Sequence, residues 1–183
     1  MLPHFETERL ILRPRAMADF EACLAMDRDP EVTRHIPGPW HDPVHHAQFL
    51  RERIAWAPGP GLGYWSIFPK ERPAHFVGWI LLIPCNGTGP EIEIGWRLIR
   101  QAWGRGYAPE AARAVLVHAF ETLGLPLIVA DIAPLNTGSQ RVAAKIGMTC
   151  MENGAHGGMP CKVYRMTAEA YRRRRAEGVT RVS

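Results

Sequence analysis

A glycine-containing segment at residues 101–109 carries the clearest chemical signal in the chain. It reads Gln-Ala-Trp-Gly-Arg-Gly-Tyr-Ala-Pro, and it stands between a segment typical of a β-strand and one typical of a helix. Such a loop presents unpaired backbone N–H groups and the positive end of the helix dipole at one point. Gly104 and Gly106 let an anion approach the backbone, and Arg105 adds positive charge. The segment therefore predicts a phosphate site, which a pyrophosphate would fit.

Two common nucleotide-binding motifs do not match this segment. A Walker loop requires Gly-x4-Gly-Lys-Ser/Thr, and a dinucleotide site requires Gly-x-Gly-x-x-Gly with an acidic residue about 20 positions later. Neither pattern is present at residues 101–109. The alternatives that remain are a phosphate loop of another class and glycines that only turn the chain.

The hydrophobic pattern predicts the elements that position this loop. Strands are expected at residues 8–13, 63–68, 76–83, 91–98, 127–132 and 162–167, and helices at 17–26, 44–56, 108–123 and 136–146, with a basic helix after them. Strands followed by a β-α-β-α-β order indicate an α/β (α+β) fold, a mixed sheet flanked by helices. Without an internal repeat or a dividing linker, residues 1–183 are expected to form a single domain.

Composition narrows the possible environments and partners. No apolar run approaches the roughly 20 residues that span a bilayer, and no secretory signal is visible, so a cytoplasmic location without a membrane partner is expected. The four cysteines lack metal-ligand spacing. The net charge of +4 comes largely from the tract Arg172–Arg175, which is typical of a solvated helix face, with contact to nucleic acid as the alternative.

Four segments, in order, resemble the GNAT superfamily of acetyltransferases. Gln-x-x-Gly-x-Gly at residues 101–106 resembles its coenzyme A pyrophosphate loop. Residues 6–13, 91–96 and 136–148 resemble the first strand, the fourth strand and the Asn-x-x-Ser-x-x-x-x-x-Lys-x-Gly-Phe/Met segment of the branch that includes ribosomal-protein N-terminal acetyltransferases. The resemblance covers residues 6–167.

This resemblance implies a GNAT fold and an acetyl-CoA site. The expected sheet is mostly antiparallel, has about seven strands flanked by about four helices, and splays between strands 4 and 5 to admit the pantetheine arm. Backbone groups near Leu98 and Ile99 would pair with that arm, and the amides of residues 103–108 would hold the pyrophosphate. The cofactor-binding set is Leu98, Ile99, Gln101, Trp103, Gly104, Arg105, Gly106, Tyr107, Ala108, Asn136, Ser139 and Lys145. Further candidates for phosphate charge are Arg100 and Arg141.

Acid and base roles follow from the chemistry of acetyl transfer to an amine. Glu93 and Glu91 stand on one strand face about 7 Å apart, and either could accept the amine proton. Ala143 stands where many family members have a tyrosine, which leaves Ser139 as the candidate acid. Tyr164 is the second candidate, provided that its strand runs beside the cleft.

The acceptor is expected to enter between residues 27–43 and the loops at 57–63 and 148–160. Trp40, Trp65 and Trp79 are candidates for its wall, although Trp79 is assigned to the core.

His41, His45 and His46 are expected in a surface turn rather than a metal site, because Pro43 interrupts any helix there. No metal is therefore expected.

The resulting functional expectation is transfer of an acetyl group from acetyl-CoA to a primary amine, either a protein N-terminus or a small molecule. The alternatives are a catalytically silent acyl-CoA-binding sensor or partner module, and a nucleic-acid-binding accessory domain that uses the arginine tract. A homodimer that pairs through the last strand is an expectation from the family alone.

Overall fold

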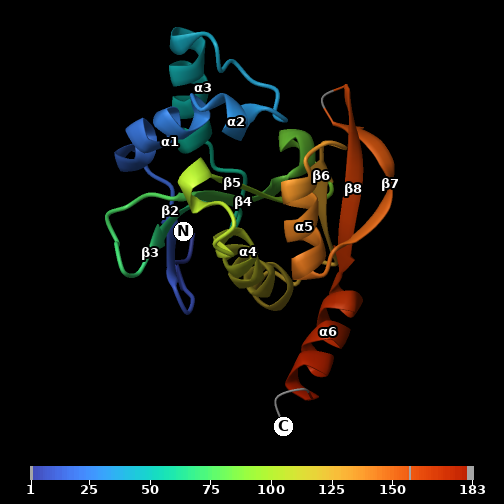
Figure 1. The fold of residues 1–183 in the computed structure, drawn as a ribbon. Coiled ribbons are helices and arrows are strands. Elements are labelled where there is room, and N and C mark those ends of the chain that lie inside the picture. Colours follow the sequence, from blue (N-terminus) through green and yellow to red (C-terminus); the bar gives the residue numbers. More distant parts are fainter. Residues whose placement is uncertain (1, 157, 181–183) are drawn as a thin grey trace.

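The computed structural model describes residues 2–156 and 158–180, and its described strands form one eight-stranded sheet in the order β1-β2-β3-β4-β5-β6-β8-β7 (Figure 1). The strands are β1 (Phe5–Glu6), β2 (Leu10–Pro14), β3 (Gly63–Pro69), β4 (Gly78–Pro84), β5 (Ile92–Leu98), β6 (Leu127–Ile132), β7 (Thr149–His156) and β8 (Met159–Thr167). Neighbouring strands are antiparallel except for β5 and β6, which are parallel. The mixed, mostly antiparallel sheet expected from the sequence is confirmed.

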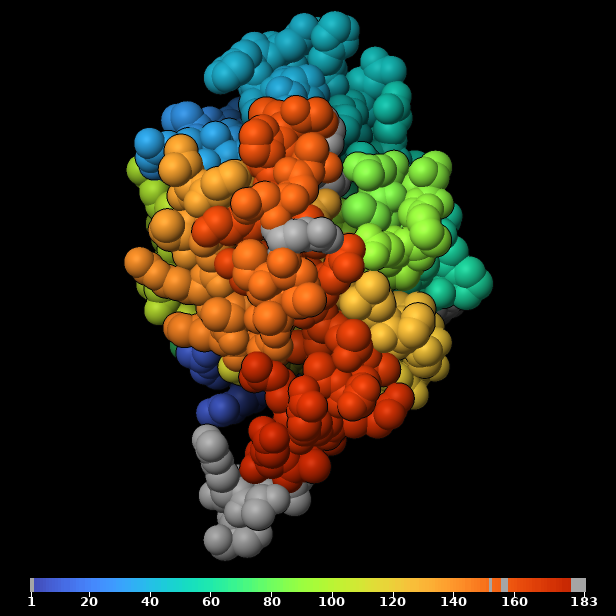
Figure 2. All heavy atoms as spheres, turned by 90° about the vertical axis from the view of Figure 1, so that its right-hand side faces the viewer, coloured from blue at the N-terminus to red at the C-terminus, as the bar shows by residue number. Residues whose placement is uncertain are grey.

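Helices cover both faces of this sheet. They are α1 (Phe20–Asp27), α2 (Pro30–Thr33), α3 (Pro43–Ala55), α4 (Tyr107–Val117), α5 (Thr137–Ile146) and α6 (Ala168–Thr180), with shorter turns η1 (Met17–Asp19), η2 (Cys85–Gly87), η3 (Arg100–Ala102) and the π-helical η4 (His118–Thr122). Helices α1 to α3 gather at one end of the view in Figure 1, away from α4. Figure 2 shows the β7–β8 side, with the red residues of α6 at its lower end.

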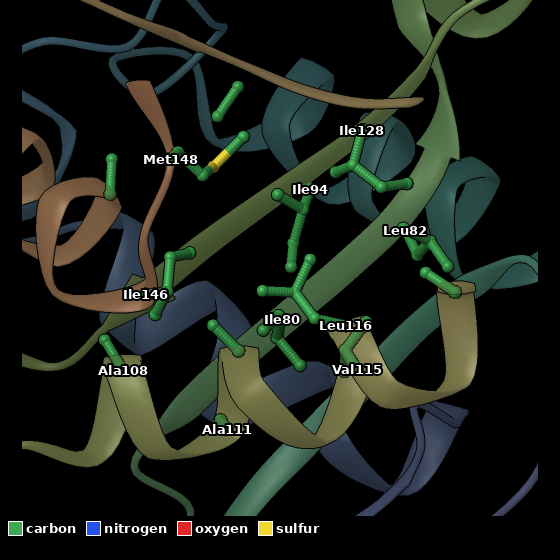
Figure 3. Packing of buried hydrophobic residues seen from close by; sticks show 14 of the residues in the cluster. Ile80, Leu82, Ile94, Ala108, Ala111, Val115, Leu116, Ile128, Ile146 and Met148 are labelled. Atoms are coloured by element: carbon green, nitrogen blue, oxygen red, sulfur yellow. The ribbon is translucent and has the colours of Figure 1, made fainter. Parts of the chain in front are cut away.

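The larger hydrophobic core lies between the sheet and α4. The small residues Ala111 and Ala112 are fully buried and let the helix approach the strands closely. Ile80 and Leu82 of β4 point from the sheet toward Val115 of α4 (Figure 3). Full burial of each such branched side chain contributes about 1.5–3 kcal/mol. The apolar face of α4 is thus what holds the glycine loop against the sheet.

A second hydrophobic cluster lies on the opposite face of the sheet, under α1 to α3. Phe20 and Leu24 of α1 pack there with Trp79 and Leu81 of β4. Strand β4 is therefore buried on both faces, as its uninterrupted apolar sequence predicts. This placement confirms the assignment of Trp79 to the core.

The parallel pairing of β5 with β6 stops soon after it starts. The strands pair at two positions, Ile92 with Ile128 and Glu93 with Val129. The rest of β5 runs beside β4 up to Leu98 without a paired residue on β6. The expected splay between the strands at residues 91–98 and 127–132 is confirmed.

Several local expectations are wrong. Pro43 does not interrupt a helix but begins α3, since Asp42 caps it by accepting hydrogen bonds from the backbone N–H groups of Val44 and His45. As a result His46 is 1% exposed rather than in a surface turn. Trp65 does not line the acceptor wall, because its side chain is fully buried and its indole donates to the Pro3 carbonyl at 2.7 Å.

Some elements escape sequence reasoning. The short α2 lies within the segment at 27–43 that is expected to be irregular, and β7 contains a glycine and polar residues that weaken a strand pattern. Among the helices of the described residues, none is long and apolar enough to cross a membrane.

Leu82→Ala tests the main core. Leu82 is fully buried, so its truncation should lower the free energy of unfolding by about 2–5 kcal/mol, through lost transfer energy and a residual cavity. Urea denaturation followed by circular dichroism measures the change. Val117→Ala on the exposed side of α4 is the control, since Val117 is 38% exposed, and an equal loss in both variants would contradict this account of the core.

Candidate active site

The gap between β5 and β6 exposes backbone groups of β5. The Ile99 N–H donates to the Val77 carbonyl at 3.0 Å, so residues in step with Ile99 direct their backbone groups toward β4. In an antiparallel ladder the direction alternates from residue to residue. The N–H and C=O groups of Trp96 and the N–H of Leu98 therefore face the gap, where β6 has diverged. An extended ligand arm could pair with them as an additional strand would.

The sequence predicts that Ile99 pairs with the ligand arm, but the backbone of Ile99 does not contribute to this edge. Its N–H is bonded to Val77, and its carbonyl accepts from the Ala102 N–H at 3.0 Å. The Leu98 carbonyl accepts a hydrogen bond from the indole of Trp103 at 2.9 Å. Of the backbone groups expected to pair with the ligand arm, the geometry therefore supports the Leu98 N–H. The Trp103 amide is also engaged, since it donates to the Arg100 carbonyl at 3.1 Å.

The glycine loop has the backbone that an anion site requires. Gly104 and Gly106 have φ values of +74° and +80°, a region that side-chain-bearing residues rarely adopt. A Cβ on Gly104 would meet no atom within 4 Å, so the space beside this backbone is open. Helix α4 begins directly after Gly106, at Tyr107, and the first N–H groups of a helix have no acceptor within it.

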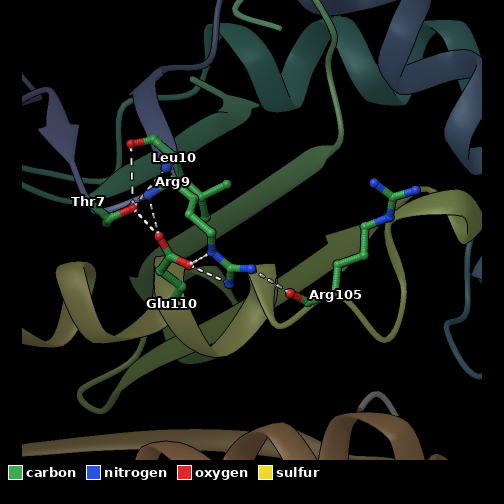
Figure 4. A network of polar contacts seen from close by, with 5 residues as sticks. All are labelled: Thr7, Arg9, Leu10, Arg105 and Glu110. Carbon is green, nitrogen blue, oxygen red and sulfur yellow. Dashed lines mark hydrogen bonds and ion pairs between the residues drawn. The ribbon is translucent and has the colours of Figure 1, made fainter. Parts of the chain in front are cut away.

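Glu110 anchors this loop to the turn between β1 and β2. Its carboxylate accepts from the Thr7 hydroxyl at 2.6 Å and from the Arg9 backbone N–H at 2.9 Å, and it pairs with the Arg9 guanidinium at 2.6 Å. The same guanidinium donates to the Arg105 carbonyl at 3.1 Å. Figure 4 shows the side chain of Arg105 directed away from this network. The network thus fixes the backbone of the loop and leaves the Arg105 charge outside it.

Helices α4 and α5 and the end of β5 enclose a cavity of about 590 Å³, which we call the cofactor cavity. The predicted cofactor-binding residues that line it are Leu98, Trp103, Gly104, Gly106, Tyr107, Ala108, Asn136, Ser139 and Lys145, and the charge candidate Arg141 joins them. Ile99, Gln101 and Arg105 are not part of this lining. Residues 31–32 and 34–36, in and after α2, also line it, and no sequence motif pointed to them.

A second cavity of about 290 Å³, the acceptor cavity, opens on the face of the sheet under α1 and α3. Its lining includes Trp40 and Trp79 from the predicted acceptor wall. The two cavities meet where the strands diverge, because six residues line both: His35, Ile36, Trp96, Arg97, Asn136 and Ser139.

Asn136 and Ser139 at this junction are held by helix capping. The Asn136 side-chain oxygen accepts from the Ser139 backbone N–H at 3.0 Å and caps the start of α5. This bond occupies the oxygen of the Asn136 amide. Its NH₂ group can still donate to a ligand.

Two carboxylates from different strands line the acceptor cavity near the junction. Glu93 stands on β5 and Asp131 on β6, and both lie close to the thiol of Cys85, which is 3.9 Å from the Asp131 carboxylate. Burial, followed by the charges of Glu93 and Asp131, raises the pKa of Cys85 to about 11. Sequence reasoning identified Glu93 but missed Asp131, because nothing in the sequence aligns two strands across the gap.

Two other catalytic candidates lie outside both cavities. Glu91 forms an ion pair with Arg165 at 3.6 Å, and Tyr164 is buried in the main core. Burial, and then its neighbour Cys150, raises the pKa of the Tyr164 phenol. Strand β8 does border the acceptor cavity at residues 159–161, but the Tyr164 side chain packs in the core and does not reach that cavity.

The acceptor cavity also contains buried ions that the sequence did not reveal. Asp27 of α1 receives a hydrogen bond from Arg97 at 2.6 Å, and His46 of α3 lies 3.4 Å from the same carboxylate. Arg97 shares a strand face with Glu93, so the sequence pattern predicts exposure to solvent, and its burial follows from the helices that cover this face. Among the described residues no group of three or more acidic, histidine or cysteine side chains could hold a metal.

Comparisons with known proteins agree with this geometry. Residues 9–149 match the model of the family described as Acetyltransferase (GNAT) domain. The chain is 32% identical over 161 residues to the FsC-acetyl coenzyme A-N(2)-transacetylase of Aspergillus fumigatus, covering 82% of this chain and 66% of that protein. It is 33% identical over 161 residues to the protein YkkB of Bacillus subtilis, covering 84% and 90%.

A solved structure is also similar. The acetyltransferase from Agrobacterium tumefaciens str. C58 is 35% identical, covers 91% of this chain and 95% of its own, and superposes with a TM-score of 0.77. The chain therefore belongs to the GNAT acetyltransferase family, and it is an acetyl-CoA-dependent acyltransferase. Acetyl-CoA is the co-substrate. The open glycine loop, the start of α4 and the unpaired edge of β5 suit its pyrophosphate and pantetheine.

Glu110→Gln tests the anchor of the loop. Burial raises the pKa of this carboxyl, but the hydrogen bonds from Thr7 and Arg9 outweigh burial and lower it overall. Its stabilising contribution is thus present above the unfolded-state pKa of about 4.3 and is lost as pH falls through the folded-state pKa. At pH 7 the variant should lose about 1–2 kcal/mol, since Arg9 is half-exposed and screened.

Urea midpoints measured from pH 7 to pH 3 check this expectation. The difference between parent and variant should shrink in acid, whereas Glu169→Gln on exposed α6 should show little difference throughout. A difference in urea midpoint between parent and Glu110→Gln that persists unchanged at pH 3 would contradict the role assigned to the ionised carboxylate.

Proposed function

We propose that this protein is an N-acetyltransferase that moves an acetyl group from acetyl-CoA directly to a primary amine. The observation that carries the proposal is the meeting of the two cavities at the gap, since six residues line both. A thioester held there would face an amine that enters from the other cavity, and such positioning supplies much of the rate enhancement of a transfer reaction. An acceptor cavity beside the cofactor cavity favours this function over a silent acyl-CoA-binding module.

The roles of individual residues follow from their positions. The unpaired N–H groups of β5 at the gap could polarise the thioester carbonyl. Glu93 accepts the proton that the amine loses as the new C–N bond forms. The negative charge of Asp131 helps to attract the approaching amine. Ser139 at the start of α5 donates a proton to the departing thiolate. Gly104, Gly106 and the first N–H groups of α4 hold the pyrophosphate.

The finer identity of the enzyme is also a proposal. Residues 1–183 form a single catalytic domain of the branch that includes ribosomal-protein N-terminal acetyltransferases, and the chain acts in the cytoplasm. A solved neighbour described as a putative ribosomal-protein-serine acetyltransferase from Vibrio cholerae shares the fold, at 20% identity and a TM-score of 0.69. Neither nucleic acid nor a membrane is a required partner, and a homodimer is compatible with the fold.

Gly104→Glu tests the cofactor site. The parent should gain several degrees in Tm with saturating acetyl-CoA, as any ligand of the folded state does, and the variant should not, because a carboxylate replaces the space for phosphate. Gly124→Glu is the matched control, since Gly124 also has positive φ (+64°) and nothing within 4 Å of an added Cβ. An acetyl-CoA shift that survives in Gly104→Glu would refute this pyrophosphate site.

Glu93→Gln tests the general base. On the amine that releases most thiol in a screen of acceptors, kcat/KM should fall about a hundredfold near pH 7, the lower end of the usual range for such a group. Glu91→Gln is the control on the same strand face, outside both cavities. If kcat/KM falls a hundredfold in Asp131→Asn but not in Glu93→Gln, the general base is the Asp131 carboxylate of β6.

A further inference from the structure

The acceptor cavity carries positive charge on the partly buried Arg15 and the buried Arg97. The guanidinium of Arg97 lies 4.9 Å from the ring centre of Trp79, and that of Arg15 lies 5.9 Å from the same ring. Arg15 also stacks on Tyr64, at 3.7 Å. Both arginines line the cavity, so two cations stand at one place on its wall.

The carboxylate beside them is already shared. Asp27 receives the hydrogen bond from Arg97 at 2.6 Å and lies 3.4 Å from His46. The Arg15 guanidinium donates a hydrogen bond to a neutral group, the Arg53 carbonyl, at 3.0 Å. Burial is the largest effect on Arg15 and lowers its pKa overall, although Tyr64 and Asp27 act in the opposite direction. This part of the cavity thus has more positive than negative charge.

Each of the two guanidinium groups also has an unused donor. Nε of Arg15 and Nε of Arg97 are buried without a hydrogen-bond partner among the described residues. Buried donors without an acceptor cost free energy, and in folded proteins they are uncommon. Neither Nε is accessible from the cavity, so an anion there would be bound through the terminal nitrogens of the two guanidinium groups and would offset the excess charge.

The carboxylates of Glu93 and Asp131 mark the other end of the cavity. Glu93 and Arg97 lie four residues apart on one face of β5, which corresponds to about 13 Å along the strand. Gly95 lies between them, and a Cβ there would come within 3.2 Å of the Leu81 side chain. The Leu81 side chain occupies the space beside Gly95, so these two residues form an apolar floor between the acidic and basic ends of the cavity.

We propose that the acceptor carries a carboxylate as well as the reacting amine, and that Arg15 and Arg97 bind the carboxylate while the amine lies between Glu93 and the gap. This inference rests on the proposed function, because it assigns the acceptor of the same site. The acceptor class is a short amino carboxylate whose two charged groups are separated by several bonds. Guanidinium groups favour carboxylates because their paired donors match the two oxygens.

Calorimetric titration with matched probes tests the proposal without turnover. 6-Aminohexanoate and hexylamine differ in the carboxylate, and each is titrated into the protein with and without coenzyme A. We expect 6-aminohexanoate to bind at least tenfold more tightly. Equal affinities would overturn the proposal, and tighter binding of 6-aminohexylphosphonate would overturn the choice of a carboxylate.

Two arginine variants locate the effect. Arg15→Met keeps an apolar stem over Tyr64 and should remove most of the preference for 6-aminohexanoate, whereas Arg15→Lys should restore part of it. Arg51→Met is the control, because Arg51 is an exposed arginine of α3 that does not line the cavity. A preference that survives in Arg15→Met, or is lost equally in Arg51→Met, contradicts the assignment.

The same titrations separate this inference from the proposed function. Binding of coenzyme A is measured independently in every variant, and its absence in the parent would count against the acetyltransferase site. Coenzyme A binding together with equal affinity for the two amines would leave the acetyltransferase proposal standing and refute the amino carboxylate.

Discussion

The divergence of β5 from β6 is the constraint on which the site depends. Backbone N–H and C=O groups in a protein interior require partners, and a continuous sheet would provide them along the whole of β5. Here pairing with β6 ends at Glu93 and Val129, so the next groups of β5 face a gap. A sheet edge of this kind is ready to accept an extended ligand. The fold therefore provides its binding edge by omitting strand pairs rather than by adding a loop.

The helices that follow the diverging strands concentrate this effect. Helix α4 begins after the glycine loop that leaves β5, and α5 begins at the Asn136 cap after β6. The first residues of both helices line the cofactor cavity. Both starts carry the partial positive charge of a helix N-terminus, which favours an anionic ligand, although the Thr137 and Ser139 N–H groups of α5 are already bonded. The apolar face of α4 and the Glu110 network hold the first of these starts in place.

Features with a local cause could be predicted from the sequence. The strand at 127–132 has the bounds expected from its apolar run, and most of the glycine loop lines the cofactor cavity. Failures occur where distant segments decide the environment. Arg97 has the alternation of a solvent-facing residue, yet α1 and α3 cover it and supply Asp27. Asp131 enters the site only because β6 returns beside β5, and no pattern within either strand encodes that approach.

The acceptor cavity is coupled to the stability of the fold. Trp79, Leu81 and Ile83 form part of its wall, and the same residues belong to the hydrophobic cluster under α1 to α3. A substitution there would change the shape of the acceptor cavity and the packing of the core together, and it would lower the stability of the fold. Residues of the segment between α2 and α3, such as His35 and Pro37, line the cavity from outside that cluster. Acceptor preference can therefore change most easily through this segment, while β4 and its ion-paired neighbour Arg97 preserve the basic end of the cavity.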